Sequence, residues 1–429
     1  MVREKQPERI SPVEGNRDML PYEDFKREFI YDAIEYSIYD PLQEGTVLEI
    51  KDQQVILGKD LHRTDNSVLY EAYTASNPEN KFIAKFSVSN PNLEKNCKEA
   101  YIHRVLSTGE VMDQEERDFL MDNITQKLKD WYRQRGRQFN NQSVMDFQRA
   151  VSSFKDNGEI PEDLKKNIPP ALVKEYIELF SKGQTRPNPN IPSSFGEVLA
   201  FMQDSRGAKW YRVGTFMENI AEENKNRKPG EKINNLLELK NQLSATQKIS
   251  AWTATAFALR KLHSRKISHR DVKPGNVIYD PKEKKSKLID LGLAEKAGPT
   301  YGIDRVKGTP PYLSPELITG NAKNTRSSDI FALGTSLFTQ FFGYEGLFNR
   351  GVYDDRFKGH ASRTKSIFSP RFSFENKIKK EDSTAQKMLL QLIEQMTLPE
   401  EERISIDEVC HAMVKIYQEF QKEEAKQAS

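Results

Sequence analysis

Cysteine is scarce in this chain of 429 residues, which contains only Cys97 and Cys410. Two cysteines cannot build a disulfide framework, so the sequence favours a reducing compartment. No uncharged apolar run approaches the roughly 20 residues of a membrane-spanning helix. The charged stretch Met1–Ile10 is not followed by the apolar segment that a secretory signal requires. We therefore expect a cytoplasmic protein without a membrane span.

An excess of charge of either sign is also lacking. The 65 lysines and arginines nearly cancel the 63 aspartates and glutamates, which leaves a formal net charge of +2. Because nucleic-acid-binding proteins usually carry a basic surplus, this balance predicts no nucleic-acid partner. Apolar residues make up 37% of the chain and charged residues 30%, so a core can form inside a well-solvated surface.

The most informative stretch is His269–Asn276, which reads His-Arg-Asp-Val-Lys-Pro-Gly-Asn. This polar loop lies between an amphipathic stretch and the apolar run Val277–Tyr279. Loops held between regular elements commonly present side chains to a substrate. Asp290–Gly292, with the sequence Asp-Leu-Gly, begins 14 residues after the end of the loop, and Ser314–Glu316, Ser-Pro-Glu, follows later in the chain.

These motifs resemble, in order, the catalytic loop H-R-D-x-K-P-x-N, the metal-binding D-F-G and the A-P-E of the eukaryotic-type protein Ser/Thr kinases. The resemblance implies an α+β fold, the bilobal protein kinase fold, with an antiparallel-sheet N-lobe and a helical C-lobe. It also implies an ATP-dependent protein serine/threonine kinase that transfers the γ-phosphate of Mg-ATP to Ser or Thr hydroxyls of protein substrates. The competing interpretation is a surface loop with a capping aspartate and an unrelated Asp-Leu-Gly turn.

The resemblance gives each polar motif residue a role. Asp271 is expected to be the catalytic base that orients the acceptor hydroxyl and takes its proton. Lys273 is expected to contact the transferring phosphate. Asn276 and Asp290 are expected to hold Mg²⁺, a hard cation that prefers oxygen ligands. Thr309 resembles the threonine of a G-T-x-x-Y motif, and we expect it to hydrogen-bond Asp271 or Lys273.

Nucleotide contacts are expected upstream of the loop. Lys85, in the sequence Phe-Ile-Ala-Lys-Phe, resembles the lysine of the V-A-I-K strand and would neutralise the α- and β-phosphates. We predict Glu99 as its carboxylate partner, because Glu99 shares a helical face with Ile102 and Leu106. The rival is Glu94, on another face of the same predicted helix, and helix phase favours Glu99.

Glycine is missing where the family places its phosphate-covering loop. The pattern G-x-G-x-x-G-x-V is matched by Gly58 and Val68, with no glycine between them. Glycines in such a loop let backbone N–H groups approach the phosphates, so their loss bears on nucleotide affinity rather than nucleotide identity. Met217, Glu218 and Ile220 are predicted to form the hinge that meets the adenine edge.

Three further residues are expected to support the loop. Asp329 resembles the helix aspartate that braces the catalytic-loop backbone. Arg403 resembles the arginine that pairs with the glutamate of the A-P-E motif, here Glu316. The activation segment is expected at 290–316. Arg270 would pair with a phosphorylated residue of this segment if one exists, and the candidate acceptors are Thr300 and Tyr301.

Hydrophobic periodicity predicts the organisation of the chain. We expect an N-terminal arm and helix (1–45), a first part of the N-lobe (46–106), a helical insertion (107–194), a second part of the N-lobe with the hinge (195–220) and a C-lobe (221–429). Strands are predicted at 47–50, 54–57, 67–75, 82–88, 196–201 and 211–217. Helices are predicted at 21–39, 92–106, 144–154, 170–180, 328–342, 383–396 and 405–419, with others after residue 113 and after Ser244.

Two other functions fit parts of the sequence. A pseudokinase-like scaffold that binds partners through the insertion would explain the missing glycines, but Lys85 and the loop residues are all present. A small-molecule kinase is disfavoured, because such enzymes usually lack an activation segment of this kind. The insertion carries more apolar residues than a kinase core needs, so we expect it to mediate a homodimer or a partner contact.

The insertion and the decayed glycine loop also resemble features of the effector kinases, of the Legionella type, that intracellular bacteria deliver into the host cytosol.

Overall fold

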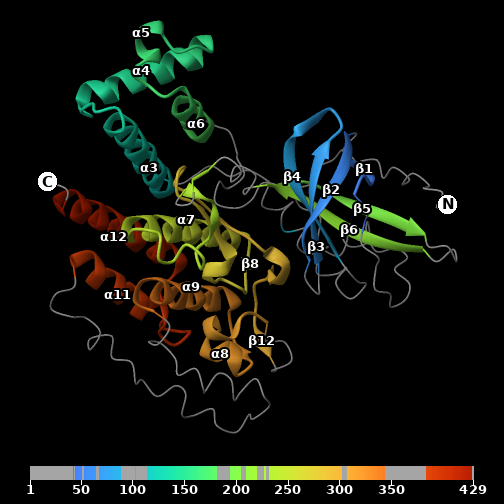
Figure 1. Cartoon of the computed structure of the whole chain (residues 1–429). Coiled ribbons are helices and arrows are strands. Elements are labelled where there is room, and N and C mark those ends of the chain that lie inside the picture. The colour runs from blue at the N-terminus through green and yellow to red at the C-terminus, as the bar shows by residue number, and fades with distance from the viewer. Residues whose placement is uncertain are drawn as a thin grey trace. The chain divides into compact units, whose positions relative to one another are not determined.

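The computed structural model describes residues 42, 44–50, 53–63, 67–87, 102, 114–180, 194–203, 209–219, 227–228, 231–301, 307–343 and 383–427 (Figure 1). The chain divides into two compact units. One comprises Met1–Thr108 and Pro187–Ser429, and the other, which we call the helical unit, comprises Gly109–Arg186. The predicted helices at 21–39 and 92–106 lie outside the described residues, apart from the helical and buried Ile102.

The first unit contains a six-stranded antiparallel sheet with the strand order β1-β2-β3-β4-β6-β5. Its strands are β1 (Val47–Ile50), β2 (Gln53–Arg63), β3 (Ser67–Thr74), β4 (Asn77–Ser87), β5 (Ser194–Gln203) and β6 (Lys209–Glu218). All six were predicted, and their ends differ by a few residues. The largest difference is in β2, which continues six residues past Leu57, its predicted end, to Arg63.

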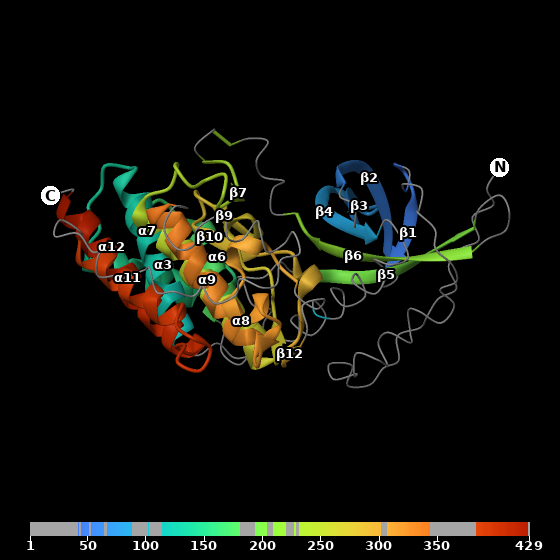
Figure 2. The same ribbon diagram turned by 90° about the horizontal axis from the view of Figure 1, so that it is seen from below.

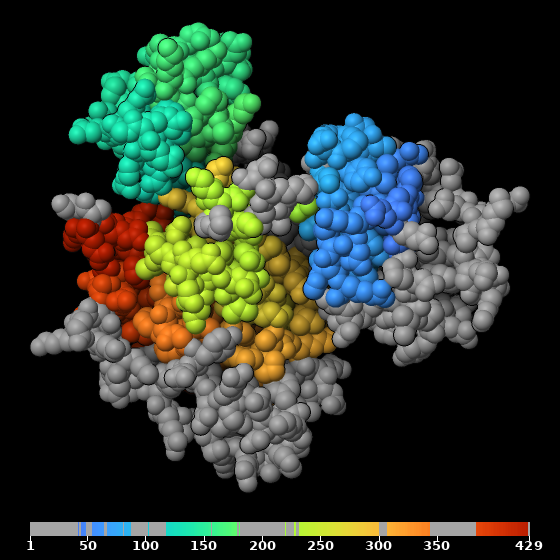
Figure 3. Space-filling model, viewed as in Figure 1, coloured from blue at the N-terminus to red at the C-terminus, as the bar shows by residue number. Residues whose placement is uncertain are grey.

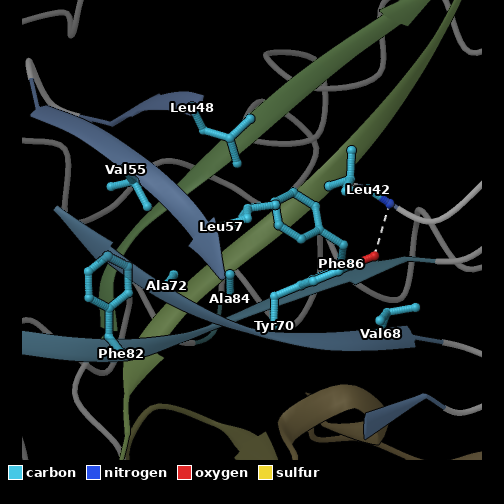
Figure 4. Close-up of a cluster of buried hydrophobic side chains, with 10 residues drawn as sticks. All are labelled: Leu42, Leu48, Val55, Leu57, Val68, Tyr70, Ala72, Phe82, Ala84 and Phe86. Atoms are coloured by element: carbon cyan, nitrogen blue, oxygen red, sulfur yellow. Dashed lines mark hydrogen bonds between the residues drawn. The ribbon is translucent and has the colours of Figure 1, made fainter. Parts of the chain in front are cut away.

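Alternation of side chains builds the core of this sheet. Val68, Tyr70 and Ala72 on β3 are buried with Ala84 and Phe86 on β4 (Figure 4). The rings of Tyr70 and Phe86 meet edge to face with their centroids 6.1 Å apart, and the Tyr70 hydroxyl accepts a 3.0 Å hydrogen bond from the backbone N–H of Leu42. Since successive strand residues point to opposite faces, Lys85 lies on the face opposite this core.

The turn between β3 and β4 differs from the prediction. Asn77–Pro78 was predicted to form it, whereas the turn residues are Ala75 and Ser76, and β4 already begins at Asn77. Pro78 is tolerated inside the strand because β4 pairs with β6 only from Phe82 onward, so its missing N–H removes no bond to that neighbour.

The helical unit has its own core. It consists of α3 (Gln114–Arg133), α4 (Asn141–Asn157), the single turn α5 (Glu162–Lys165) and α6 (Pro170–Phe180), and these pack into a dense body (Figure 3). Helix α6 packs against α3 and α4. Phe147 and Tyr176 meet edge to face at 5.7 Å, and Lys127 binds Glu175 at 2.8 Å. The predicted helices at 144–154 and 170–180 are confirmed, whereas α5 is too short for periodicity to reveal.

The C-terminal part of the first unit is mainly helical. It contains α7 (Ala245–Ser264), α8 (Pro315–Ile318), α9 (Thr325–Phe342), α11 (Thr384–Met396) and α12 (Ile406–Gln427). Ser244 and Gln247 form a capping box at the start of α7. Helix α7 packs against α9 and α12 (Figure 2). Together with the sheet, this is the α+β fold that was predicted. None of the described helices is both long enough and apolar enough to cross a membrane.

Short strands connect these helices. They are β7 (Asn234–Asn235), β8 (Ile267–Ser268), β9 (Val277–Asp280), β10 (Lys285–Leu288), β11 (Glu295–Lys296), β12 (Thr300–Tyr301) and β13 (Asn321–Ala322). The residues between β8 and β9 are the His-Arg-Asp loop. The hairpin of β9 and β10 leads directly to Asp290.

A buried ion pair ties α8 to the segment before α12. Arg403, whose side chain is fully buried, donates to both carboxylate oxygens of Glu316, at 2.7 and 3.2 Å. The predicted pairing of these two residues is confirmed. Burial of Glu316 opposes its ionisation, but the hydrogen bonds and the charge of Arg403 outweigh this effect and hold the pKa of Glu316 below its usual value.

This pair predicts a pH dependence of stability. Since the pKa of Glu316 is lower in the folded than in the unfolded chain, its contribution is present above the ordinary glutamate pKa of 4.5 and is lost as the pH falls through the folded value. We expect wild type to be more stable than Glu316→Gln near pH 7, and the difference to shrink below about pH 4.5. Urea denaturation of both proteins across this range measures it; a difference that stays constant would contradict the assignment.

Candidate functional site

One carboxylate binds the backbone of the His-Arg-Asp loop, which follows β8. The backbone N–H groups of His269 and Arg270 donate to the two oxygens of Asp329 on α9, each at 2.8 Å. Nε2 of His263, at the end of α7, lies 3.0 Å from the same carboxylate. Arg270 has a φ of 66°, a left-handed backbone conformation that is unfavourable for residues other than glycine. The predicted role of Asp329 as a brace is confirmed, because its bonds hold this strained turn.

Asp271 is the centre of a hydrogen-bond network. Its Oδ1 accepts a 2.6 Å bond from the Thr309 hydroxyl, and its Oδ2 accepts bonds from Lys273 Nζ at 2.7 Å and Asn276 Nδ2 at 2.9 Å. Lys273 Nζ also donates to the Thr309 hydroxyl at 2.7 Å. Thr309 was expected to contact Asp271 or Lys273, and it contacts both. These bonds fix the carboxylate in one orientation, and Asp271 is only 7% exposed.

His269 fixes the loop against the next strand. Its Nδ1 accepts a hydrogen bond from the backbone N–H of Asp271 at 3.3 Å, so Nε2 carries the proton and donates to the carbonyl of Ile289 at 3.1 Å. The N–H of Ile289 in turn donates to the carbonyl of Asn276 at 2.9 Å. Because Asp290 follows Ile289, these bonds bring the candidate metal residues Asn276 and Asp290 to the same end of the β9–β10 hairpin.

The oxygen atoms at this end suit a cation that is shared with phosphates. Asn276 uses its Nδ2 on the carbonyl and the carboxylate of Asp271, and within the described residues its Oδ1 accepts no hydrogen bond. The Asp290 side chain is 42% exposed. No group of three or more His, Cys, Asp or Glu side chains in the described ranges could hold a metal alone. These residues therefore fit Mg²⁺ that completes its coordination with nucleotide oxygens and water.

Lys85 lies beside this end of the hairpin. Its Nζ is 3.3 Å from Oδ1 of Asp290, and its side chain is 14% exposed. The predicted partner Glu99 and its rival Glu94 lie outside the described residues. The structure thus brings together Lys85, Asp290 and the Asp271 network, which come from three distant parts of the sequence.

The prediction that Val68 contacts the nucleotide does not agree with its position in the sheet. Val68 is 1% exposed within the sheet core, opposite Phe86 in the ladder, so its assignment as a nucleotide contact is corrected. Leu69 pairs with Lys85 and lies on the same face as the lysine, because directly opposed residues in a ladder share a face. Sequence reasoning missed Leu69, because only the register of β3 against β4 shows which β3 residues share the face of Lys85.

Gly58 was expected in a phosphate-covering loop but is buried inside β2. A methyl group on Gly58 would lie 3.2 Å from the Glu71 carboxylate, which binds Lys81 at 2.9 Å. The glycine therefore makes room for a partly buried ion pair. Met217 and Glu218 are the last residues of β6, paired with Ile83 and Phe82, and Ile220 lies outside the described residues.

An antiparallel sheet, a helical C-terminal part and a braced loop that presents aspartate, lysine and asparagine are the features of the bilobal protein kinase fold. Comparison with known proteins agrees: residues 221–414 match the protein kinase domain family. Through this domain the chain is similar to the eukaryotic-type protein Ser/Thr kinases.

Several curated kinases are similar to part of the chain. The serine/threonine-protein kinase SBK1 of Danio rerio is 41% identical over 93 residues, 20% of this chain and 24% of that protein. The cAMP-dependent protein kinase catalytic subunit PRKX of Mus musculus is 33% identical over 131 residues, 29% of this chain and 35% of its own length. The inactive serine/threonine-protein kinase PLK5 of Mus musculus is 42% identical over 86 residues, 20% of this chain and 14% of that protein. The chain thus spans about a third or less of these relatives.

Proposed function

We propose that this protein transfers the γ-phosphate of Mg-ATP to serine or threonine hydroxyls of protein substrates, with Asp271 as the catalytic base. The observation that carries the proposal is the carboxylate of Asp271, which three donors from Lys273, Asn276 and Thr309 fix in one orientation. A fixed carboxylate can orient an acceptor hydroxyl and take its proton as the new bond forms.

The residues next to Asp271 are proposed to stabilise charge, shape the acceptor site and hold the metal ion. The ammonium of Lys273 lies between Asp271 and Thr309, where it can balance charge that develops on the transferred group. Thr309 holds the activation segment against the base and shapes the acceptor site. Asn276 and Asp290 would hold Mg²⁺, which supplies charge neutralisation to the phosphates when bound.

Lys85 is the proposed phosphate-binding cation of the sheet. Its contact with Asp290 supports this role, since both residues would then face the same triphosphate. We propose Leu69, on the face of Lys85, as an apolar contact of the nucleotide. Glu99 remains the predicted partner of Lys85, and Met217, Glu218 and Ile220 remain the predicted hinge.

A second candidate is a pseudokinase-like scaffold that binds a protein partner, or a second copy of the chain, through the predicted insertion at 107–194. Its support is the lack of glycine between Gly58 and Val68 and the similarity to a kinase described as inactive. A helical unit with its own core is also suited to an independent binding role.

Incubation of the full chain with ATP and a generic basic acceptor protein separates these functions. With Mg²⁺, we expect mass spectrometry to find phosphoryl groups on serine or threonine of the acceptor or of the protein itself. With EDTA in place of Mg²⁺, we expect none. If Mg-ATP raises the melting temperature but no transfer occurs over hours, the scaffold function is favoured.

A further inference from the structure

Arg270, directly before the proposed base, already has an anionic partner within the chain. Its Nη1 donates to the carboxylate of Glu295 in β11. The arginine side chain is 6% exposed and that of Glu295 is 40% exposed. A guanidinium this deeply buried requires a compensating charge. The expected partner of Arg270 was a phosphorylated residue, whereas the structure supplies a carboxylate.

The segment around Glu295 is also held by its backbone. Glu295 and Lys296 pair with Ser268 and Ile267 of β8, and the N–H of Ala297 donates to the carbonyl of Lys266 at 2.7 Å. These bonds attach the activation segment directly to the strand that enters the catalytic loop.

The attachment continues toward Tyr301. The carbonyl of Gly298 accepts a 3.2 Å bond from the N–H of Thr325, and Thr300 and Tyr301 pair with Ala322 and Asn321 of β13. Activation segments that depend on phosphorylation are ordered by new bonds between arginine and phosphate. Residues 295–301 are thus held by backbone pairing with β8 and β13 and by the carboxylate of Glu295.

Arg270 links this segment to Asp271. A methyl group on Gly308, which has a φ of 124°, would lie 2.6 Å from the carbonyl oxygen of Arg270. Thr309, the next residue, holds Asp271. The backbone of Arg270 therefore lies against Gly308 of the activation segment, and its side chain binds Glu295 of the same segment. Displacing its side chain would disturb the strained turn that orients the base.

We propose that Glu295 is a positioning residue that takes the place of an activation-segment phosphate, so that the kinase is active without phosphorylation of this segment. The proposal rests on the proposed function. Glu295 acts through Arg270 and contacts neither substrate nor nucleotide. Any phosphate that paired with Arg270 would compete with the Glu295 carboxylate.

The first test compares phosphatase-treated protein, the double variant Thr300→Ala/Tyr301→Phe and untreated wild type in the acceptor assay. We expect kcat values within about two-fold of one another, because none of the ordering bonds needs a phosphate. Loss of activity after phosphatase treatment, restored by a phosphorylating kinase, would overturn the proposal while leaving the proposed function intact.

The second test removes the carboxylate. Glu295→Gln is expected to lower kcat by about 10- to 100-fold with KM for ATP within about three-fold, because the base is misplaced while the nucleotide contacts remain. Glu295→Asp should recover part of the loss, and Arg270→Ala/Glu295→Ala should be no slower than Arg270→Ala alone. Glu424→Gln, the same change on an exposed face of α12, is the matched control. Equal kcat for Glu295→Gln and wild type would refute the role.

Hydrogen exchange separates this proposal from the proposed function. We expect the amides of residues 295–301 to be protected in unphosphorylated wild type and to exchange faster in Glu295→Gln, whether or not phosphoryl transfer occurs. Rapid exchange in unphosphorylated wild type would overturn the anchoring. Wild type without transfer, but with this protection, would remove the proposed function and retain the structural role of Glu295.

Discussion

Asp271→Asn is expected to lower the rate constant for phosphoryl transfer by about 10²–10⁴-fold, the usual contribution of a general base. An amide cannot take the proton of the acceptor hydroxyl. Its NH₂ group would also face Lys273 Nζ or the Thr309 hydroxyl, in place of an oxygen that accepts from them. ATP affinity should change by less than about three-fold, because the base does not hold the nucleotide. Single-turnover transfer and nucleotide titration measure the two effects.

Two further variants make this result specific. Asp271→Ala removes the donor–donor conflict as well as the carboxylate, so a similar loss in both variants assigns the effect to the missing base. Asp407→Asn makes the same chemical change at an exposed position of α12 and should leave the rate unchanged. If Asp271→Asn transferred phosphate within about ten-fold of wild type, Asp271 would not be the base.

The parts of the site that are close in sequence were predictable from the sequence. Residues of one octapeptide loop keep their spacing when the loop folds, so Asp271, Lys273 and Asn276 were certain to lie near one another. Thr309 and Asp290 were found because their motifs follow the His-Arg-Asp loop in the order that is typical of protein kinases. The sheet was predictable as well, since apolar residues alternate along β3 and β4.

Contacts between distant residues were less predictable. Lys85 contacts Asp290 in the described structure, and Arg270 contacts Glu295. Neither pairing could be predicted from a local sequence pattern, because two charged residues that meet in space need not have any regular spacing in the sequence. Val68 was misassigned for a different reason. A shift of one residue in the alignment of a strand exchanges its two faces, and only the register with β4 identifies the face that carries Lys85.

Asp329→Ala is expected to reduce the free energy of unfolding by about 3–5 kcal/mol, the range found when one partner of a buried charged network is removed. Asp329 is 1% exposed. Its carboxylate accepts hydrogen bonds from two backbone N–H groups and also lies against His263. Alanine would leave these donors buried without an acceptor. Urea denaturation at neutral pH measures the loss, and Glu394→Gln, on the exposed side of α11, should change stability by less than about 0.5 kcal/mol.

The same substitution should also reduce phosphoryl transfer in the fraction of protein that remains folded. Arg270 keeps its left-handed backbone because Asp329 holds its N–H, so without the brace the turn can relax and Asp271 loses its orientation. His263→Gln, which removes a single contact of the same carboxylate, should cost less stability and leave the turn in place. A folded Asp329→Ala protein with wild-type kcat would show that the backbone conformation before the base does not govern catalysis.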